Sequence, residues 1–469
     1  MVGYWTPLEW LALAERELLL FAGVFFLIGA VDELAIDVGW LWLKLTGRAR
    51  TPRIDRGQAQ GRPLTGPAAV LIAAWQESHI IEYTVAHALA AWPQAELRLY
   101  IGCYRNDPDT LEAIMRGAGG DPRARVVIHD ADGPTTKADC LNRLYAAMQA
   151  DEARVGQGFR LVVLHDAEDM VDPAALALLD AALERADFIQ LPVLPEAQRA
   201  SRWIGSHYCE EFAEAHGKAM IVREALAASL PAAGVGCGFS RRMLAVLAAR
   251  TGWPGPFATD SLTEDYELGL RIRALGGRSR FLRLRGEDGQ LVATRACFPA
   301  RIDHAVRQKA RWIHGIALQG WDRLGWNGGA GERWMLLRDR RGPMTALVLF
   351  AGYLLLVLGA VLLAIRTFGV RGDLAALWRE APLLDALLAA NFAAFLWRAA
   401  MRFVFTAREY GWQEGVRALA RIPVTNVVAI MAGRRALAAY VAALFGAKPR
   451  WDKTFHHAYP TARPVRPSA

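Results

Sequence analysis

Residues 159–173 read FRLVVLHDAEDMVDP and decide the fold class of this chain. The apolar run is short and ends abruptly in acidic residues, which is typical of a buried strand that opens onto a loop at the carboxyl edge of a sheet. Similar short apolar runs occupy 68–75, 96–103, 125–130 and 187–193. Helical patterns separate them at 78–92, 109–118, 137–150 and 173–185. Strands that alternate with helices predict an α/β domain with a mostly parallel sheet, covered by helices on both faces.

Acidic residues follow three of the predicted strands. Glu77 follows the first strand and Asp107 the second, while Asp166, Glu168 and Asp169 end the run quoted above. Because parallel strands end at one edge of a sheet, these carboxylates should converge and repel one another. A divalent cation with oxygen ligands, Mg²⁺ or Mn²⁺, is the usual compensation. A solvated acidic turn without a metal explains the same residues equally well, and the sequence alone leaves both interpretations open.

A second acidic motif, Thr263-Glu264-Asp265, opens an amphipathic helical pattern. Thr263 suits the N-cap position and acids in the first turn suit the helix dipole, so a structural role is sufficient. The alternative is chemical, because Asp265 could take a proton from a hydroxyl group as a general base.

Residues 308–312, QKARW, place Gln308, Arg311 and Trp312 on one helical face. An arginine can neutralise phosphate and a tryptophan ring can stack on a sugar. A helix that packs at a membrane interface through its tryptophan is the structural alternative.

Three segments are predicted to cross a membrane. Residues 344–365 carry no charge and span about 33 Å as a helix, enough for the hydrocarbon core. Residues 18–31 predict a first membrane helix with a Trp-rich interfacial continuation, and 381–397 predict a shorter third span. Residues 422–445 are also apolar, but Arg434 and Arg435 lie at their centre, which favours interfacial or re-entrant helices over a span.

The predicted domain organisation follows from these segments. It comprises a membrane helix and its continuation at 1–47, a linker at 48–67, the α/β domain at 68–341, two membrane helices at 342–402, and interfacial or re-entrant helices with a tail at 403–469. Arginines that follow the third predicted span place the α/β domain in the cytoplasm.

Composition agrees with a soluble domain joined to a few membrane helices. The chain has 469 residues, of which 53% are hydrophobic and 22% charged, which excludes a disordered chain. Its net charge is +8, but the basic residues are spread along the chain and orient membrane segments, so nucleic acid is not expected as a partner. The 5 cysteines form no CxxC pair, so neither a zinc cluster nor a disulfide framework is expected.

The motifs, in this order, resemble processive family 2 membrane glycosyltransferases of the cellulose- and hyaluronan-synthase type. The likeness rests on AAWQE, Asp107, KADCLN at 137–142, HDAED, TED and QKARW. Segments 210–224, 232–244 and 451–460 are similar to the bacterial phage-adsorption protein B (NfrB-like) group. Members of that group carry a further C-terminal domain resembling a cyclic-di-GMP binder, which we expect this chain to lack because it stops at Ala469.

The resemblance implies a GT-A fold and an inverting, metal-dependent transfer of a sugar, an N-acetylhexosamine, from a UDP-sugar to a growing exopolysaccharide. It implies a multi-pass protein of the bacterial inner membrane, with membrane lipids and an export or outer-membrane protein as partners. Two alternatives stay open: transfer to a lipid-linked acceptor on a polyprenyl-phosphate carrier, and a catalytically silent membrane scaffold.

The resemblance also assigns roles to single residues. Asp265 is implied as the general base. The implied donor-binding residues are Trp75, Glu77, Asp107, Lys137, Asp166 and Arg311. The implied acceptor-binding residues are Gly236, Gly238, Gln308 and Trp312. Asp166 and Glu168 are implied as metal ligands, and Asp169 is the alternative to Glu168.

Overall fold

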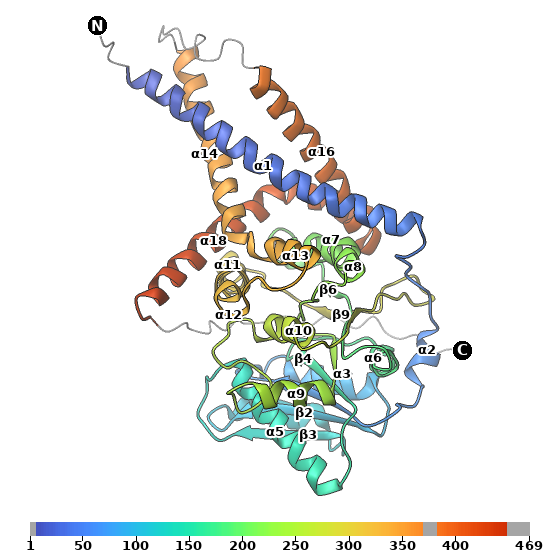
Figure 1. Cartoon of the computed structure of the whole chain (residues 1–469). Coiled ribbons are helices and arrows are strands. Elements are labelled where there is room, and N and C mark those ends of the chain that lie inside the picture. Colours follow the sequence, from blue (N-terminus) through green and yellow to red (C-terminus); the bar gives the residue numbers. More distant parts are fainter. Residues whose placement is uncertain (1–5, 369–381, 448–469) are drawn as a thin grey trace.

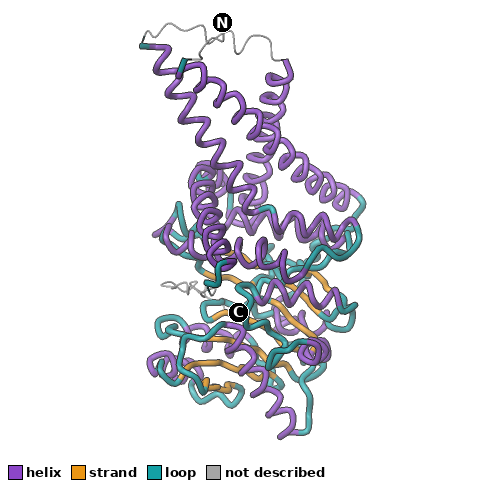
Figure 2. The backbone as a smooth tube through the Cα atoms, turned by 60° about the vertical axis from the view of Figure 1, so that its left-hand side comes forward, coloured by secondary structure: helices purple, strands orange, loops and turns teal. Residues whose placement is uncertain are grey.

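The computed structural model describes residues 6–368 and 382–447. All strands and most short helices gather at one end of the molecule, and long helices extend from the other (Figures 1 and 2). The segment 451–460, which contributed to the resemblance, lies outside the described residues.

The main sheet has seven strands in the order β3-β2-β1-β4-β7-β5-β8. Their bounds are β1 Ala68–Ala73, β2 Leu97–Tyr104, β3 Ala124–His129, β4 Leu161–Asp166, β5 Phe188–Gln190, β7 Cys237–Ser240 and β8 Ser279–Phe281. Neighbouring strands are parallel except at β7, which is antiparallel to both β4 and β5. A second sheet pairs β6 (Val193–Pro195) with β9 (Thr294–Ala296). The predicted mostly parallel α/β sheet is confirmed.

Alternation along the central strands places apolar side chains on both faces of the sheet. Val70 and Ile72 pack beneath α3 (Ile81–Ala91), α4 (Pro108–Ala118) and α6 (Ala175–Ala182). Ala69 and Leu71 face the opposite layer, which comprises α5 (Lys137–Val155), α9 (Arg241–Arg250) and α10 (Glu264–Ala274). Two apolar cores therefore clamp the strands whose carboxyl ends carry the predicted acids.

Short helices lie between the sheet and the long helices (Figure 1). They are α7 (His207–Glu214), a π-helical turn at Ala215–Ala219, α8 (Met220–Ala225), α11 (Ile302–Trp312), a π-helical segment at Ile313–Gln319, α12 (Gly320–Leu324) and α13 (Ala330–Arg340). Elsewhere the structure has α2 (Arg56–Gln60) in the predicted linker, a 3₁₀ turn at Arg199–Ser201, and α17 (Trp412–Ala420).

Four described helices are long and apolar enough to cross a membrane, judged by length and composition. They are α1 (Pro7–Leu45), α14 (Gly342–Thr367, of which Gly342–Ile365 qualifies), α16 (Pro382–Tyr410) and α18 (Ile422–Leu444). The re-entrant helix pair predicted for 422–445 is wrong, because α18 is one continuous helix. It begins at Ile422, carries Pro423 in its first turn, where proline is tolerated, and contains no further proline. Its interfacial position stays a prediction.

Ion pairs tie α1 to the rest of the molecule. Glu33 is bound by Arg338 at 2.8 Å and by Arg398 of α16 at 3.0 Å. Asp37 is paired with Lys218, and both side chains are almost fully buried. Removing one member of such a buried pair costs about 3–5 kcal/mol because its partner is left uncompensated. The acids that end the predicted first membrane segment therefore fasten it to the α/β domain.

Candidate active site

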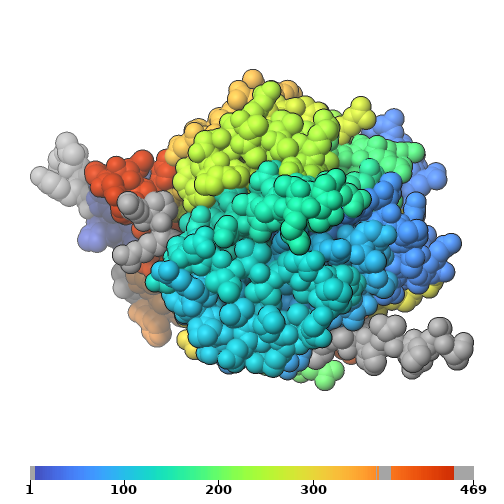
Figure 3. Space-filling model, turned by 90° about the horizontal axis from the view of Figure 1, so that it is seen from below, coloured from blue at the N-terminus to red at the C-terminus, as the bar shows by residue number. Residues whose placement is uncertain are grey.

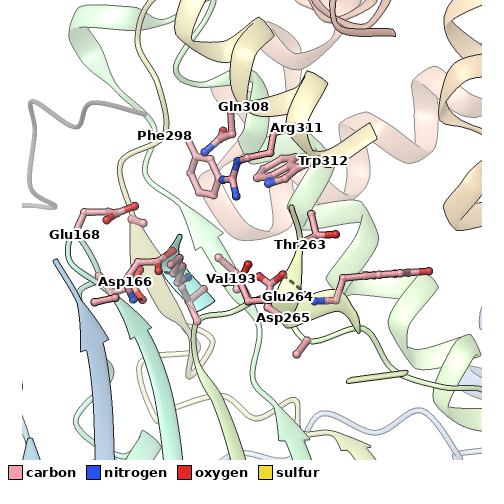
Figure 4. Close-up of a pocket in the computed structure, with 18 of the residues that line it drawn as sticks. Asp166, Glu168, Val193, Thr263, Glu264, Asp265, Phe298, Gln308, Arg311 and Trp312 are labelled. Atoms are coloured by element: carbon pink, nitrogen blue, oxygen red, sulfur yellow. Dashed lines mark hydrogen bonds and ion pairs between the residues drawn. The ribbon is translucent and has the colours of Figure 1, made fainter. Parts of the chain in front are cut away.

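A cavity of about 390 Å³ opens at the carboxyl ends of β1 and β4. It brings together most of the predicted site residues, which come from widely separated segments: Trp75, Glu77, Lys137, Asp166, Glu168, Asp169, Asp265, Gln308, Arg311 and Trp312. Figure 4 shows Gln308, Arg311 and Trp312 on one side and the carboxylates of Asp166 and Asp265 across from them.

Lys137 links the acidic groups. It is the first residue of α5, whose N-cap Thr136 accepts a hydrogen bond from the backbone N–H of Asp139 at 3.1 Å. Its Nζ forms an ion pair with Asp166 Oδ1. Burial alone lowers the pKa of Lys137, but Asp166 and the acids of the TED motif outweigh it and hold the pKa well above its usual value. Lys137 is therefore a permanent cation on the cavity wall.

The turn after β4 carries two further acids, Glu168 and Asp169, which lie in different surroundings. Asp169 is buried, and its Oδ2 accepts the backbone N–H of Asp166 at 2.9 Å and lies 2.8 Å from His165 Nδ1. Burial raises the pKa of Glu168 well above its ordinary value, and the nearby charges of Asp166 and Glu77 raise it further. Burial raises the pKa of Asp169 too, although its contact with His165 lowers it. Asp169 therefore shapes the turn, and both acids stand where added positive charge would favour their ionised forms.

Asp107 contacts the backbone of the turn that lines the cavity rather than the cavity itself. Its Oδ2 accepts the backbone N–H of Gln76 at 2.5 Å, and Gln76 has a left-handed φ of 54°. This bond holds the turn that carries Trp75 and Glu77 at the end of β1. The Trp75 ring packs edge-on against Tyr104, with ring centroids 5.1 Å apart. Asp107 itself is not among the residues that line the cavity, so it positions Trp75 and Glu77 there.

Asp265 lies in the first turn of α10. Its Oδ1 accepts the backbone N–H of Tyr266 at 2.7 Å, and Gly234 lies so close to Oδ2 that a Cβ there would overlap it. Burial raises the pKa of Asp265, against a lowering by Lys137, and Asp166 is near enough to raise it further. Asp166 and Asp265 both line the same cavity, which a joint role requires.

Thr263 corrects one local prediction. It occupies the N-cap position of α10, but its side chain makes no capping hydrogen bond. Instead Gly315 packs directly on the Thr263 side chain, where a Cβ would lie 2.5 Å from Oγ1. Close approach of the π-helical segment, rather than capping, explains this threonine, and π-helical segments are frequent at functional sites.

The QKARW residues overhang the cavity from α11 (Figure 4). Arg311 donates through Nη1 to the carbonyl of Leu262 at 3.3 Å. Its Nε and the Oε1 of Gln308 are buried without a hydrogen-bond partner among the described residues. Trp312 packs edge-on against Phe298, with centroids 6.4 Å apart. Buried polar groups without partners are costly, so these two atoms at the cavity are available to hydrogen-bond a polar ligand.

The two predicted acceptor glycines do not line the cavity. Gly238 lies within β7, paired with Val163 of β4 and Ile189 of β5, and Gly236 precedes this strand with a φ of 58°. Residues of the preceding loop line the cavity instead: Pro231, Ala232, Ala233 and Val235. Both glycines therefore contribute to the backbone that supports this loop: Gly238 through strand pairing and Gly236 through its left-handed conformation.

Several lining residues were absent from the predicted site. Burial and the charge of Asp265 raise the pKa of Glu264 to about 7. Tyr266 donates its hydroxyl to Asp339 of α13 at 2.9 Å, and Phe298 follows β9. Glu264 could have been found, because it stands inside the TED motif, whereas Asp339 and Phe298 carry no local signal.

The described residues contain no group of three or more His, Cys, Asp or Glu side chains arranged to hold a metal. The carboxylates of Asp166 and Glu168 still supply the oxygen donors that Mg²⁺ or Mn²⁺ prefers, and their crowding is relieved by a cation. These two carboxylates fit a divalent metal, and a bound molecule would have to supply its remaining ligands.

Comparison with known proteins gives a family. Residues 66–315 match the family model "Glycosyltransferase like family 2". The chain is 32% identical to bacteriophage adsorption protein B of Escherichia coli K12 over 455 residues, which cover 92% of this chain but 61% of that relative. Among solved structures, the chain is similar to a mannosyltransferase of Pyrobaculum calidifontis in complex with GDP-Man and Mn²⁺, with 17% sequence identity and a TM-score of 0.48. The superposition covers 90% of this chain and 99% of the mannosyltransferase chain.

Proposed function

This chain belongs to glycosyltransferase family 2, and we propose that it transfers a sugar from a UDP-sugar to a growing polysaccharide by single displacement with inversion. The predicted glycosyltransferase activity and GT-A class, with a mostly parallel sheet, are confirmed at the level of the family. The donor, the acceptor and the roles of single residues belong to the proposal.

One observation carries the proposal: two cations and two sets of carboxylates face one another across a single cavity. Lys137 and Arg311 supply positive charge toward a diphosphate, and Asp166 with Glu168 would hold a divalent cation beside it. Such a cation would neutralise charge on the diphosphate and make UDP a better leaving group. Trp75, held against Tyr104, supports a uridine subsite at the end of β1.

In the proposed reaction an acceptor hydroxyl oxygen attacks the anomeric carbon from the face opposite to UDP. The bond from this carbon to the diphosphate oxygen breaks, UDP leaves with the electron pair, and Asp265 accepts the hydroxyl proton. A carboxylate in this role contributes about 10²–10⁴-fold to the rate. Arg311 stabilises negative charge as it develops on the leaving group. The raised pKa of Asp265 suits a general base because it strengthens proton affinity.

The acceptor side of the cavity supports a product that grows at a membrane. Gln308 and Trp312 belong to α11, which packs on α18 through Ala310 against Ala432 and Ala436. The aromatic wall of Phe212, Phe298 and Trp312 offers flat apolar surfaces to sugar rings. We propose a bacterial inner-membrane protein with a cytoplasmic catalytic domain, and an N-acetylhexosamine as the sugar. A polyprenyl-phosphate carrier is the alternative acceptor, favoured by the same proximity to membrane-length helices.

Product analysis tests this proposal. Membranes containing the chain are incubated with a panel of radiolabelled UDP-sugars and Mn²⁺, and the products are sized. Long chains from one UDP-sugar support polysaccharide synthesis, and a single sugar extractable with lipid supports the carrier alternative. Incorporation from no UDP-sugar but from another nucleotide sugar would contradict the donor assignment.

A further inference from the structure

A chain of hydrogen bonds runs from the active-site cavity to α13 and α8. Tyr266 and Asp339 line the cavity, and Arg223 of α8 binds Asp339. We propose that Tyr266 and Asp339 are positioning residues that hold the Asp265 carboxylate in its catalytic position. The inference rests on the proposed function, because it takes Asp265 to be the general base.

Tyr266 connects the carboxylate of Asp265 to α13. Its backbone N–H donates to Asp265 Oδ1 at 2.7 Å, and its hydroxyl donates to Asp339 Oδ2 at 2.9 Å. The same residue thus contacts the proposed base through its backbone and α13 through its side chain. Because both bonds belong to one residue, a shift of Tyr266 would also move the N–H that orients the Asp265 carboxylate.

Asp339 is a fixed partner for the tyrosine hydroxyl. Arg223, which is almost fully buried, donates from Nη1 to Asp339 Oδ1 at 2.7 Å and from Nη2 to Asp339 Oδ2 at 2.8 Å. Such a bidentate pair sets the plane of a carboxylate as well as its place. Leu336 lies three residues before Asp339 on the same face of α13 and packs in one apolar cluster with Tyr266. Packing therefore holds the ring of Tyr266, and the ion pair holds its hydroxyl.

Contacts on α13 extend this connection to the long helix α1. Trp334 donates Nε1 to Asp32 Oδ1 at 2.6 Å, and Arg338 pairs with Glu33 at 2.8 Å. The segment that carries the proposed base is thus joined through α13 to a helix long enough to cross a membrane. A purely structural link between α10 and α13 would use the same contacts. The two roles differ in whether the Tyr266 hydroxyl affects the rate of transfer.

The test removes single hydroxyl groups from the full-length protein in detergent. Tyr266→Phe keeps the ring and its packing and deletes the bond to Asp339. Tyr100→Phe is the matched control, because Tyr100 is also almost fully buried, donates to Asp151 Oδ2 at 2.8 Å, and like Asp151 does not line the cavity. Asp151 belongs to α5. The cyan and teal segments, which include α5, form the surface seen from below in Figure 3, at the end opposite the long helices.

Initial rates with the UDP-sugar selected by the panel above give kcat and KM, and calorimetry with UDP and Mn²⁺ gives the nucleotide Kd. Both variants should lose similar thermal stability, because each loses one hydroxyl-to-carboxylate bond. Misplacing a reacting group by about 1 Å costs about 10²-fold in rate, so the loosened Asp265 of Tyr266→Phe should lower kcat about 10-fold or more. Its Kd should not change, and Tyr100→Phe should keep the wild-type kcat. Equal kcat values in the two variants, or a loss confined to KM and Kd, would overturn the proposal.

Asp339→Asn, alone and combined with Tyr266→Phe, tests whether the hydroxyl acts through Asp339. Residues that act as a unit are not additive, so the double variant should lose no more kcat than the more damaged single variant. Losses that multiply would contradict this connection, and the Tyr266→Phe comparison decides the proposal even where Asp339→Asn does not fold. Asp265→Asn is measured beside them. A wild-type rate in Asp265→Asn would contradict the proposed function itself, whereas an inactive Asp265→Asn beside a fully active Tyr266→Phe would contradict the positioning alone.

Discussion

Replacing Gly234 with alanine should separate catalysis from folding. Gly234 has a φ of 74°, and a Cβ on it would overlap Asp265 Oδ2 and lie 3.2 Å from its Cγ. The atoms in the way belong to a side chain, so the fold can accommodate the methyl group by moving the carboxylate. That movement loosens the hydrogen bond from the backbone N–H of Tyr266.

Two costs can be estimated for this substitution. A left-handed alanine costs about 1–2 kcal/mol of folding stability. Restoring van der Waals distance requires Asp265 to move by about 1 Å. A displacement of this size in a reacting group lowers the rate by about 10²-fold. We therefore expect kcat to fall about 100-fold while the Kd for the UDP-sugar is unchanged.

The chain offers a matched control in Gly276, which follows α10 with a φ of 81° and has no atom within 4 Å of an added Cβ. Gly276→Ala carries the same backbone cost without touching Asp265, so its unfolding midpoint should fall similarly and its kcat should not. Initial rates of sugar transfer and donor titration by calorimetry measure both quantities. Equal kcat values for Gly234→Ala and Gly276→Ala would refute the positioning of Asp265 by Gly234.

Two further predictions concern the acids of the cavity. The pKa of Glu264 is raised from 4.5 to about 7, so the folded state retains a proton that the unfolded chain releases, and stability should fall as pH rises from about 4.5 to 7. Glu264→Gln should flatten this fall in metal-free thermal unfolding, and an unchanged slope would show that Glu264 titrates normally. Asp166→Ala should abolish the tightening of UDP binding by Mn²⁺, and a wild-type Mn²⁺ titration would remove Asp166 from the ligand set.

Much of the α/β domain was predictable because the sequence patterns of its strands and helices are local. Buried apolar runs that end in acids predicted β1, β2 and β4, and parallel pairing then brings Glu77 and Asp166 to one edge. The antiparallel β7 was missed because its four residues lie in a glycine-rich segment without strand alternation. β6, β8 and β9 have three residues each, too short for a periodic signal.

Tertiary contacts account for the rest. Gly234 packs closely against the Asp265 side chain, and Gly315 packs against Thr263. Both contacts join segments that are distant in sequence, so no local pattern encodes them. Hydropathy alone could not distinguish a surface helix from a broken one over 422–445, and the continuous α18 is set by its packing on α11 and α14. Sequence therefore identified the chemical groups, and packing decided which of them reach the cavity.

The most direct test of the proposed chemistry is Asp265→Asn, measured for both transfer rate and UDP-sugar Kd. Asparagine keeps the shape of the side chain but cannot accept the hydroxyl proton. Transfer should fall about 10²–10⁴-fold while the Kd stays within a factor of about two. A variant that transfers sugar at the wild-type rate, or that no longer binds the donor, would contradict the assignment of Asp265 as the base.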